Sequence, residues 1–380
     1  MNVPTFAPQV AALPATVPFV GPEQQERERG CPFAARLGAN ESGFGPSPLA
    51  VAAIQAAASD VWKYGDPLSA DLCAALAERH DITSEAIRVG EGIDGLLGLV
   101  VRMMISPGDT VVTSDGAYPT FNYHVTGFGG RLIKVPYRSD AEDPDALAEA
   151  AWATGARLVY LANPDNPMGS WHKAEAVLDL LARLPEDCLL LLDEAYVELA
   201  PDGVAPPVSL ADPRLLRFRT FSKAHGLAGL RIGYAIAAPA LLSGLDRIRN
   251  HFGVGRAAQA AALAALQDDA HLAAIRARVT ESRLRLTGIA AANGLAALPS
   301  AANFVAIDCR RDGLFAKAVL AGLLARHVFV RMPGVAPLDR CIRVSCGPER
   351  EMALFEAALP GALADALALA GGGASAASAV

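Results

Sequence analysis

The chain has 380 residues, which is long enough for two or three lobes with a substantial hydrophobic core. Hydrophobic residues make up 52% of it and charged residues 19%, a composition that excludes an intrinsically disordered protein. The net charge of -7 argues against a broad nucleic-acid-binding surface, so nucleic acid is not an expected partner, although a local basic pocket is compatible with this charge.

The cysteines and the N-terminus bear on the cellular compartment. The six cysteines lack the spacing of a metal site, so we expect reduced thiols, as in cytosolic proteins, and no metal. No basic region followed by an apolar stretch marks a signal peptide, and no uninterrupted apolar segment reaches the length of a membrane span. These features predict a cytoplasmic protein that does not bind membranes.

Short apolar runs alternate with helical patterns through the first two thirds of the chain. Helices such as 95–104 and 173–183 are predicted between strands at 86–89, 110–114, 131–136, 157–162, 188–193, 216–221 and 232–236. Strands that alternate with helices predict a three-layer α/β domain with a mostly parallel seven-stranded sheet. The run Leu189–Leu192 is apolar throughout, as expected of a central strand buried on both faces.

The pattern changes beyond about residue 250. A long helical stretch is predicted over 256–292, and a smaller α+β domain is indicated by short strands at 303–308, 328–332 and 341–346 and a helix at 350–359. The Pro-rich N-terminus, with its charged run 23–29, predicts an extended arm. The predicted domains are an arm with part of the small domain (1–45), a large cofactor-binding domain (46–250), a small domain (251–370) and a low-complexity, disordered tail (371–380).

Lys223 stands in a turn rich in Ser, His and Gly after a predicted strand. Thirty residues upstream, Asp193 ends the most apolar strand, where an unpaired carboxylate is costly and needs a cationic partner. Pyridoxal phosphate requires an amine for its aldehyde, a carboxylate for its ring nitrogen, and cationic and hydroxyl groups for its phosphate. We therefore predict this cofactor, with Lys223 and Asp193 as catalytic residues; a surface lysine and a strand-end salt bridge are the alternatives.

Further groups complete the predicted cofactor site. Tyr196 and Asn166 can donate hydrogen bonds to the cofactor's phenolic oxygen, and Tyr196 is counted among the catalytic residues. The phosphate is predicted to meet the Arg231 guanidinium, two hydroxyl groups and the backbone amides at a helix N-terminus. The residues that supply the hydroxyls and amides are Thr220, Ser222, Gly92, Ile93 and Asp94.

The turn Gly90–Gly95 also matches the G-x-G-x-x-G fingerprint of dinucleotide-binding folds, and Asp115 lies where a ribose-binding acid would be expected. An NAD-dependent oxidoreductase is therefore an alternative. That chemistry would leave Lys223, Asp193 and Asn166 without a joint purpose, and a glycine-rich turn before a helix binds any phosphate. We favour pyridoxal phosphate for this reason.

An aromatic residue is expected against the cofactor ring, and basic residues are expected against the substrate. An aromatic ring should stack on the cofactor, and among Tyr118, Phe121 and Tyr123 we choose Phe121, for a gain of about 1 kcal/mol; core packing is the alternative. Arg343 lies on an apolar strand and needs an anion, which a substrate carboxylate can supply. Arg331 is a second candidate for substrate binding, with a structural ion pair as the alternative.

Together these residues resemble the fold-type I aminotransferases of classes I and II, and most closely the histidinol-phosphate aminotransferase family, from about residue 19 to 367. The segment 36–48, with Asn40, and the Tyr64-Gly-Asp-Pro turn are similar to the family's. The resemblance implies a homodimer in which Tyr64 reaches the partner subunit's cofactor phosphate. It also implies that Arg331 and Arg343 hold substrate anions, and that Phe19 and Asn40 lie at the substrate.

The chain departs from the family's pattern at several positions. Met168 replaces the usual threonine, and Ile93 and Gly95 stand where Ser or Ala and Glu are usual. Phe19 replaces a more usual tyrosine, and the stretch 333–338 differs from the usual loop. Because the last changes touch the substrate side, the amine donor stays open.

The predicted function is a pyridoxal-phosphate-dependent aminotransferase. It would move an amino group from histidinol phosphate or an aromatic amino acid to 2-oxoglutarate or a similar 2-oxo acid. Lys223 would hold the cofactor and act as base in the proton shift, while Asp193 would keep the ring nitrogen protonated. Two alternatives stay open: a decarboxylase, cyclase or lyase of the same fold, and a non-catalytic binding protein.

Overall fold

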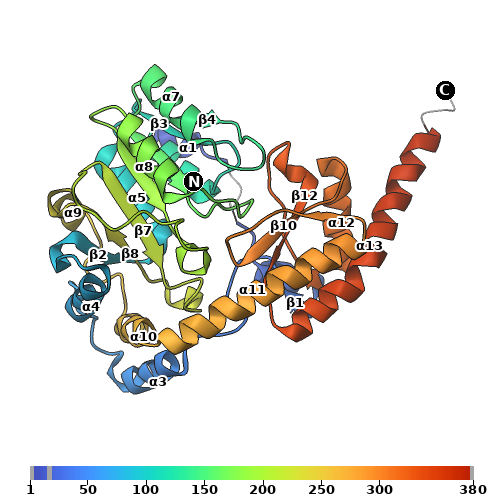
Figure 1. Cartoon of the computed structure of the whole chain (residues 1–380), viewed down its shortest axis with the longest axis horizontal. Coiled ribbons are helices and arrows are strands. Elements are labelled where there is room, and N and C mark those ends of the chain that lie inside the picture. The colour runs from blue at the N-terminus through green and yellow to red at the C-terminus, as the bar shows by residue number, and fades with distance from the viewer. Residues whose placement is uncertain (1–3, 15–18, 377–380) are drawn as a thin grey trace.

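The computed structural model describes residues 4–14 and 19–376, which form two lobes (Figure 1). The larger lobe surrounds an extended sheet, and the smaller lobe holds most of the C-terminal part of the chain. The long helix α11 (Asp269–Ala292) runs from the edge of the larger lobe into the smaller one. This arrangement agrees with the predicted α/β domain and smaller α+β domain.

The sheet of the larger lobe has seven strands: β2 (Ile87–Gly90), β3 (Thr110–Ser114), β4 (Arg131–Val135), β5 (Leu158–Ala162), β6 (Leu189–Asp193), β7 (Leu215–Thr220) and β8 (Gly233–Ile236). Their order is β2-β8-β7-β6-β5-β3-β4, and β8 runs antiparallel to the other six strands. The predicted mostly parallel sheet is therefore confirmed, and β3 has the predicted bounds.

Alternating side chains explain why the central strands are apolar throughout. In β6, Leu189 and Leu191 join the core on one face of the sheet, whereas Leu190 and Leu192 join the core on the other. Since helices cover both faces, a strand in this position needs an apolar residue at every position.

Helices complete the three layers. α5 (Gly92–Met104), α6 (Pro119–Gly127) and α9 (Pro239–Asp246) contribute to the core on one face, and α7 (Pro144–Thr154) and α8 (Ala174–Arg183) to the core on the other. A third core forms beside β2 and β8 and contains residues of α3 (Pro48–Ala57), α4 (Ala70–His80) and α10 (Arg256–Leu266).

The helix predicted over 256–292 is two helices. α10 ends at Leu266 and α11 begins at Asp269, and between them the Asp268 side chain accepts a hydrogen bond from the His271 amide at 3.0 Å. An aspartate N-cap satisfies a free amide at a helix start, and the uniform composition of this stretch hides that cap. Because α10 packs on α3 and α4, the contacts favour a domain boundary near Asp268 over one at residue 250. The domain limits themselves stay a prediction.

The smaller lobe contains two small sheets. One is antiparallel, with β10 (Phe304–Asp308) between β9 (Ala296–Ala297) and β12 (Cys341–Ser345), and the other pairs β1 (Ala35–Arg36) with β11 (Val328–Phe329). α11, α12 (Gly313–Ala325) and α13 (Glu349–Ala376) pack around them. The strand predicted over 328–332 is shorter than expected, and beyond it Arg331 makes a single bridge to Arg343.

The predictions for the two ends of the chain are partly wrong. The N-terminal arm is not wholly extended, because it contains α1 (Pro8–Ala11) and α2 (Pro22–Arg29), and the charged run forms most of α2. Pro22 starts α2 and the left-handed Gly30 ends it, which are favourable positions for both residue types. At the other end, α13 continues past residue 371 to Ala376, although glycines are unfavourable in a helix. Residues 377–380 of the predicted tail lie outside the described part.

Helix α13 is long and apolar enough, by length and composition alone, to cross a membrane over Glu349–Ala370, which the sequence prediction overlooked. One such helix is weak evidence for a membrane span. Core packing explains its composition, because apolar residues at helical spacing join the core of the smaller lobe: Met352, Phe355, Leu359, Ala362 and Ala366.

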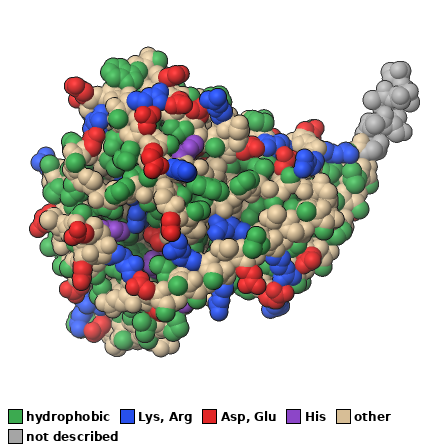
Figure 2. All heavy atoms as spheres, viewed as in Figure 1, with side chains coloured by type: hydrophobic (Ala, Val, Ile, Leu, Met, Phe, Trp, Pro, Cys, Tyr) green, Lys and Arg blue, Asp and Glu red, His purple; other side chains and the backbone are tan. Residues whose placement is uncertain are grey.

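The surface shown in Figure 2 carries a mixture of charges. Basic and acidic side chains are interspersed over both lobes, and no broad basic area covers this face. This distribution agrees with the net charge of -7.

Candidate active site

A cavity of about 650 Å³ is lined by residues of both lobes. On the large-lobe side it lies at the carboxyl ends of strands β5, β6 and β7, where open α/β sheets bind their ligands. It brings together most of the predicted site residues: Phe19, Asn40, Ile93, Asp94, Asn166, Asp193, Tyr196, Thr220, Ser222, Lys223, Arg231, Arg331 and Arg343.

Lys223 follows β7, and its partly buried side chain lines this cavity. Its Nζ donates a hydrogen bond to the backbone oxygen of Asn40 at 3.2 Å. Burial and the nearby Arg343 guanidinium lower the pKa of the Lys223 amine to about 8. A sizeable neutral fraction of this amine therefore exists near pH 8, and the neutral form is the nucleophile.

Asp193 ends β6 and is only 5% exposed. Its Oδ2 accepts a hydrogen bond from the Tyr160 hydroxyl at 2.7 Å, and its Oδ1 accepts one from the Ala195 amide at 3.0 Å. Burial raises the pKa of the Asp193 carboxyl to about 6, and the bond from Tyr160 opposes that rise. A cationic ring nitrogen would supply the positive partner that a buried carboxylate needs.

Tyr196 and Asn166 both line the cavity, as predicted. The Tyr196 hydroxyl accepts a hydrogen bond from Asn40 Nδ2 at 3.1 Å, and burial raises the pKa of Tyr196 to about 12, so it stays protonated. Asn166 follows Asp165, whose carboxylate accepts hydrogen bonds from the Met168 amide at 3.0 Å and the Tyr137 hydroxyl at 2.8 Å. These bonds hold the turn that presents Asn166 to the cavity.

The predicted phosphate donors lie together. Gly92 opens α5 with a φ of +76°, and a Cβ there would lie 2.6 Å from Nη2 of Arg231. Nη1 of Arg231 donates to Ser222 Oγ at 3.4 Å, and the Thr220 hydroxyl donates to the same oxygen at 3.0 Å. A guanidinium, two hydroxyls and the amides of a helix start therefore surround one space, and this donor set fits a phosphate.

The structure corrects the choice of stacking aromatic. Phe121 is fully buried behind the cavity, and its ring stacks on Tyr160 with centroids 4.6 Å apart and an interplanar angle of 17°. Tyr118 lines the cavity instead, and its hydroxyl donates to Asp94 Oδ2 at 3.0 Å. The sequence holds a signal for this placement, because Pro119 starts α6 and the residue before a proline leaves the helical path.

Two arginines of the smaller lobe line the cavity, as predicted. Arg343 donates through Nη1 to Asn166 Oδ1 and through Nη2 to the Gly38 oxygen at 3.2 Å. The Arg331 guanidinium lies 3.7 Å from the ring centroid of Phe19, and burial together with Arg343 lowers the pKa of Arg331 to about 10. In both arginines the buried Nε lacks a hydrogen-bond partner within the described residues. Two adjacent, incompletely paired guanidiniums are suited to anions.

Tyr64 lies outside this cavity. Its side chain is 75% exposed, and its ring packs on Phe252 with centroids 4.6 Å apart. Tyr160 and Lys134 are among the lining residues that were not predicted from the sequence. Tyr160 occupies an apolar strand, where a tyrosine is indistinguishable from a core residue until its hydroxyl partner is known.

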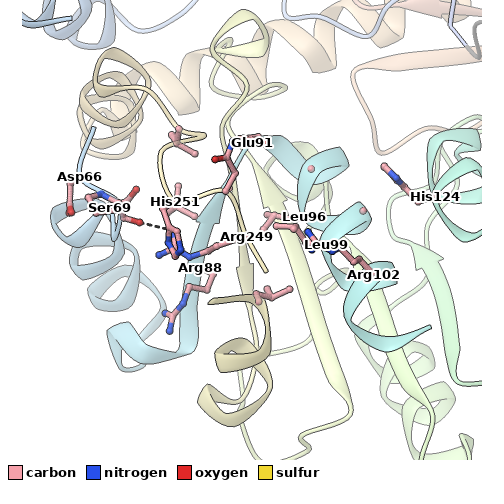
Figure 3. A pocket seen from close by; sticks show the side chains of 18 of the residues that line it. Asp66, Ser69, Arg88, Glu91, Leu96, Leu99, Arg102, His124, Arg249 and His251 are labelled. Carbon is pink, nitrogen blue, oxygen red and sulfur yellow. Dashed lines mark hydrogen bonds between the residues drawn. The ribbon is translucent and has the colours of Figure 1, made fainter. Parts of the chain in front are cut away.

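A second cavity, of about 260 Å³, lies beside the start of α5 (Figure 3). Arg88 and Arg249 line it, and both pair with Asp246. Glu91 also lines it and accepts a hydrogen bond from Asn250 at 3.2 Å. Because these charged groups already have partners, we assign no ligand to this cavity.

The fold and the large cavity define a class of protein. A mostly parallel sheet carries a lysine, a buried carboxylate and a phosphate cradle at its carboxyl edge, and this donor set fits pyridoxal phosphate. Residues 35–359 match the family described as aminotransferase class I and II, and the chain belongs to this family.

Individual relatives extend this match over nearly the whole chain. A histidinol-phosphate aminotransferase of Moorella thermoacetica is 35% identical over 363 residues, which cover 94% of this chain and 93% of that protein. One from Anaeromyxobacter sp. is 37% identical over 355 residues, with coverages of 92% and 96%. The crystal structure of histidinol-phosphate aminotransferase from Sinorhizobium meliloti in complex with pyridoxal-5'-phosphate has a TM-score of 0.93 and 52% identity, covering 96% of this chain and 98% of that chain.

Proposed function

We propose that this protein is a pyridoxal-phosphate-dependent aminotransferase that uses histidinol phosphate or an aromatic amino acid as donor and a 2-oxo acid such as 2-oxoglutarate as acceptor. The observation that carries the proposal is the convergence of Lys223, Asp193 and Arg231 on one cavity between the lobes. Family membership and the pyridoxal-5'-phosphate complex of the Sinorhizobium meliloti enzyme support the cofactor. When bound, the cofactor's protonated ring withdraws electrons from the reacting carbon of the substrate.

Three residues would divide the work around the cofactor. Lys223 would hold it through Nζ and, once displaced by the substrate amine, would take a proton from the substrate carbon and return it. The lowered pKa of Lys223, about 8, supports this role because a base must be neutral to accept a proton. Asp193 would keep the ring nitrogen protonated, and Arg231 would anchor the phosphate with Thr220 and Ser222.

The substrate side favours anionic substrates. Arg331 and Arg343 come from neighbouring positions of the smaller lobe, joined by a backbone bridge, and the Nε of each lacks a hydrogen-bond partner in the described part of the chain. One such pair can hold the phosphate of histidinol phosphate in the first half-reaction and the distal carboxylate of 2-oxoglutarate in the second. The names of the relatives support histidinol phosphate as the first donor to test.

A direct test measures the amino transfer itself. Purified protein is incubated with pyridoxal phosphate, 2-oxoglutarate and one donor at a time, and glutamate and carbon dioxide are quantified. Donor-dependent glutamate in stoichiometric amounts supports the proposal and identifies the donor. Carbon dioxide without glutamate would instead support the decarboxylase alternative, and neither product with any donor would contradict an aminotransferase of this specificity.

We also propose that the protein is a homodimer whose active sites are shared across the interface. Tyr64 is 75% exposed and packs on Phe252, which is 50% exposed, and Trp62, two positions earlier in the chain, is 78% exposed. Exposed aromatic residues that gather in one place favour a protein interface. Sedimentation equilibrium tests the dimer. Mixing a Tyr64→Ala variant with a Lys223→Ala variant tests whether the active sites are shared. If they are, one site of each mixed dimer combines an intact Lys223 with an intact Tyr64 from the other subunit, and activity is recovered.

A cytoplasmic location also belongs to the proposal. All six cysteines are unpaired, which supports a reducing compartment. Fractionation of cells that produce the protein, followed by immunodetection, tests the location.

A further inference from the structure

Tyr160 is a buried tyrosine of β5 that has no role in the function proposed above. Its side chain is 0% exposed to solvent, yet it contributes to the lining of the active-site cavity. Its hydroxyl donates to Asp193 Oδ2 at 2.7 Å, the shortest contact that Asp193 makes with another side chain in the described part of the chain. A buried hydroxyl aimed at a buried carboxylate is a strong, directional contact.

We propose that Tyr160 is a positioning residue, whose hydroxyl fixes the orientation of the Asp193 carboxylate and keeps it ionised for the cofactor's ring nitrogen. The part of the inference that concerns the cofactor's ring nitrogen rests on the proposed function. The contact between Tyr160 and Asp193 does not depend on that function.

Two donors from different elements restrain the carboxylate. Tyr160 on β5 binds Oδ2, and the Ala195 amide beyond the end of β6 binds Oδ1 at 3.0 Å. A carboxylate has about four acceptor positions, so this arrangement leaves others free for a ligand in the cavity. Rotation about the bond to the carboxylate would break both hydrogen bonds, and Asp193 is therefore held in one orientation.

Phe121 keeps the Tyr160 ring in place from behind. The two rings stack with centroids 4.6 Å apart and an interplanar angle of 17°, and both are 0% exposed. Close packing on this side leaves the hydroxyl of Tyr160 little freedom to leave Asp193. Phe121, which the sequence suggested as the ring that stacks on the cofactor, therefore packs against Tyr160, and Tyr160 in turn binds Asp193.

The charges around Asp193 show why it needs a donor. Burial raises its pKa to about 6 and Asp94 adds a like charge, whereas Tyr160, the Ala195 amide and Lys223 oppose the rise. Glu142 and Tyr196 also lie close enough to interact with it. Burial and Asp193 itself raise the pKa of Tyr160 well above its ordinary value, so the shared proton stays on the tyrosine.

The sign of the linkage gives a measurable signature in the cofactor-free protein. A carboxyl whose folded pKa is raised stabilises the fold at low pH, and this contribution is lost as the pH rises through the folded pKa, here about 6. Loss of the Tyr160 hydroxyl raises that folded pKa further. In the variant, the decrease in the free energy of unfolding with rising pH therefore ends at a higher pH.

The experiment measures free energies of unfolding of cofactor-free protein from pH 4 to 8. The Asp193 contribution is the difference between each protein and its Asp193→Asn derivative, measured for the wild type and for Tyr160→Phe. We expect the upper end of the transition to move from about pH 6 to about pH 7, since one hydrogen bond to a charged group corresponds to about one pH unit. At pH 7.5 the affinity of Tyr160→Phe for pyridoxal phosphate should fall about tenfold.

Tyr234→Phe is the matched control. Tyr234 is also a buried tyrosine of the central sheet, on β8, but its hydroxyl contacts His80 Nε2 at 3.0 Å and it does not line the cavity. An unchanged transition in Tyr160→Phe, or an equal shift in Tyr234→Phe, overturns the proposal. If Tyr160→Phe does not fold, Phe121→Leu replaces it in the experiment. This variant keeps the Tyr160 hydroxyl but removes the ring that packs against Tyr160. An unchanged transition in Phe121→Leu would then overturn the proposal. If the wild type binds no pyridoxal phosphate, the proposed function fails, whereas the pH transition still decides the role of Tyr160.

Discussion

Asp193 and Glu194 are neighbours in the chain and both are buried, but the pKa of Asp193 is raised whereas the pKa of Glu194 is lowered. Glu194 pairs with Arg217 at 2.6 Å and with Arg219 at 2.9 Å, and although burial acts to raise its pKa, the two arginines outweigh burial and lower it. Asp193 accepts hydrogen bonds from a hydroxyl and an amide, and its pKa is raised to about 6. Removing a buried carboxylate that is paired with arginines leaves their charge unbalanced, whereas a carboxylate that is incompletely neutralised is available to a cationic ligand.

The largest effect is expected at the lysine that faces Asp193. Lys223→Ala removes the group proposed to hold the cofactor and move the proton, so the rate of glutamate formation should fall by about 10³-fold or more. The exposed Lys317 on α12 provides the control, since Lys317→Ala should retain the rate of the wild type. A Lys223→Ala protein that still turns over at the wild-type rate would remove the basis for the proposed function.

The comparison between the two acids is tested most directly by neutralising each one. Glu194→Gln leaves Arg217 and Arg219 with a buried, unbalanced charge, and it should lower the free energy of unfolding by about 3–5 kcal/mol. Asp193→Asn should change the stability of cofactor-free protein by only about 1 kcal/mol, because it removes an ion that is poorly solvated in its place. Denaturant unfolding measures both. Equal losses of stability would mean that the two sites do not differ as described.

The phosphate cradle should be sensitive to a single methyl group. Gly92→Ala places a Cβ 2.6 Å from Arg231 Nη2 at a φ of +76°, so we expect the affinity for pyridoxal phosphate to fall about tenfold. Gly155→Ala is the matched control, because Gly155 also has a positive φ, +61°, but no atom of the described residues beyond its chain neighbours lies within 4 Å of its Cβ position. Backbone strain is common to both variants, and only the contact with Arg231 separates them. Similar affinities in the two variants would argue against the cradle.

A pH dependence of stability isolates Lys223. Its folded pKa, about 8, lies below its ordinary value of 10.5, so the charged amine destabilises cofactor-free protein at neutral pH. That penalty should disappear as the pH rises from about 8 to 10.5. The wild type should therefore gain stability relative to Lys223→Ala over this range. A constant difference in stability between the two proteins would show that the pKa of the Lys223 amine is not lowered.

Local pattern accounts for much of the fold and of the site. The strands of the central sheet are apolar runs of suitable length between helical patterns, and β3 matches its predicted bounds. Lys223 and Asp193 could be predicted because Lys223 follows a strand and Asp193 ends one, where parallel sheets gather their functional groups, and Arg231 stands just before β8. Chain topology then brings them together without further information.

Other features could not be read from local pattern. Tyr118 and Phe121 are close in sequence, and only the path of α6 decides which ring reaches the cavity. The division between α10 and α11 depends on the Asp268 cap within a uniformly helical composition. Likewise, the helical continuation of α13 past residue 371 was obscured by its glycines.

The amino-acid sequence by itself determined the fold class and the cofactor chemistry, and it predicted residues that the fold brings to one cavity. These depend on hydrophobic periodicity and on the residue types at strand ends, both of which are local. Only the tertiary structure decided which residues act on one another across elements: that Tyr160 donates to Asp193, that Phe121 stands behind Tyr160, and that Glu194 belongs to Arg217 and Arg219. The physical reason is that hydrogen bonds and stacking require contact within a few ångströms, which sequence spacing does not specify between separate strands.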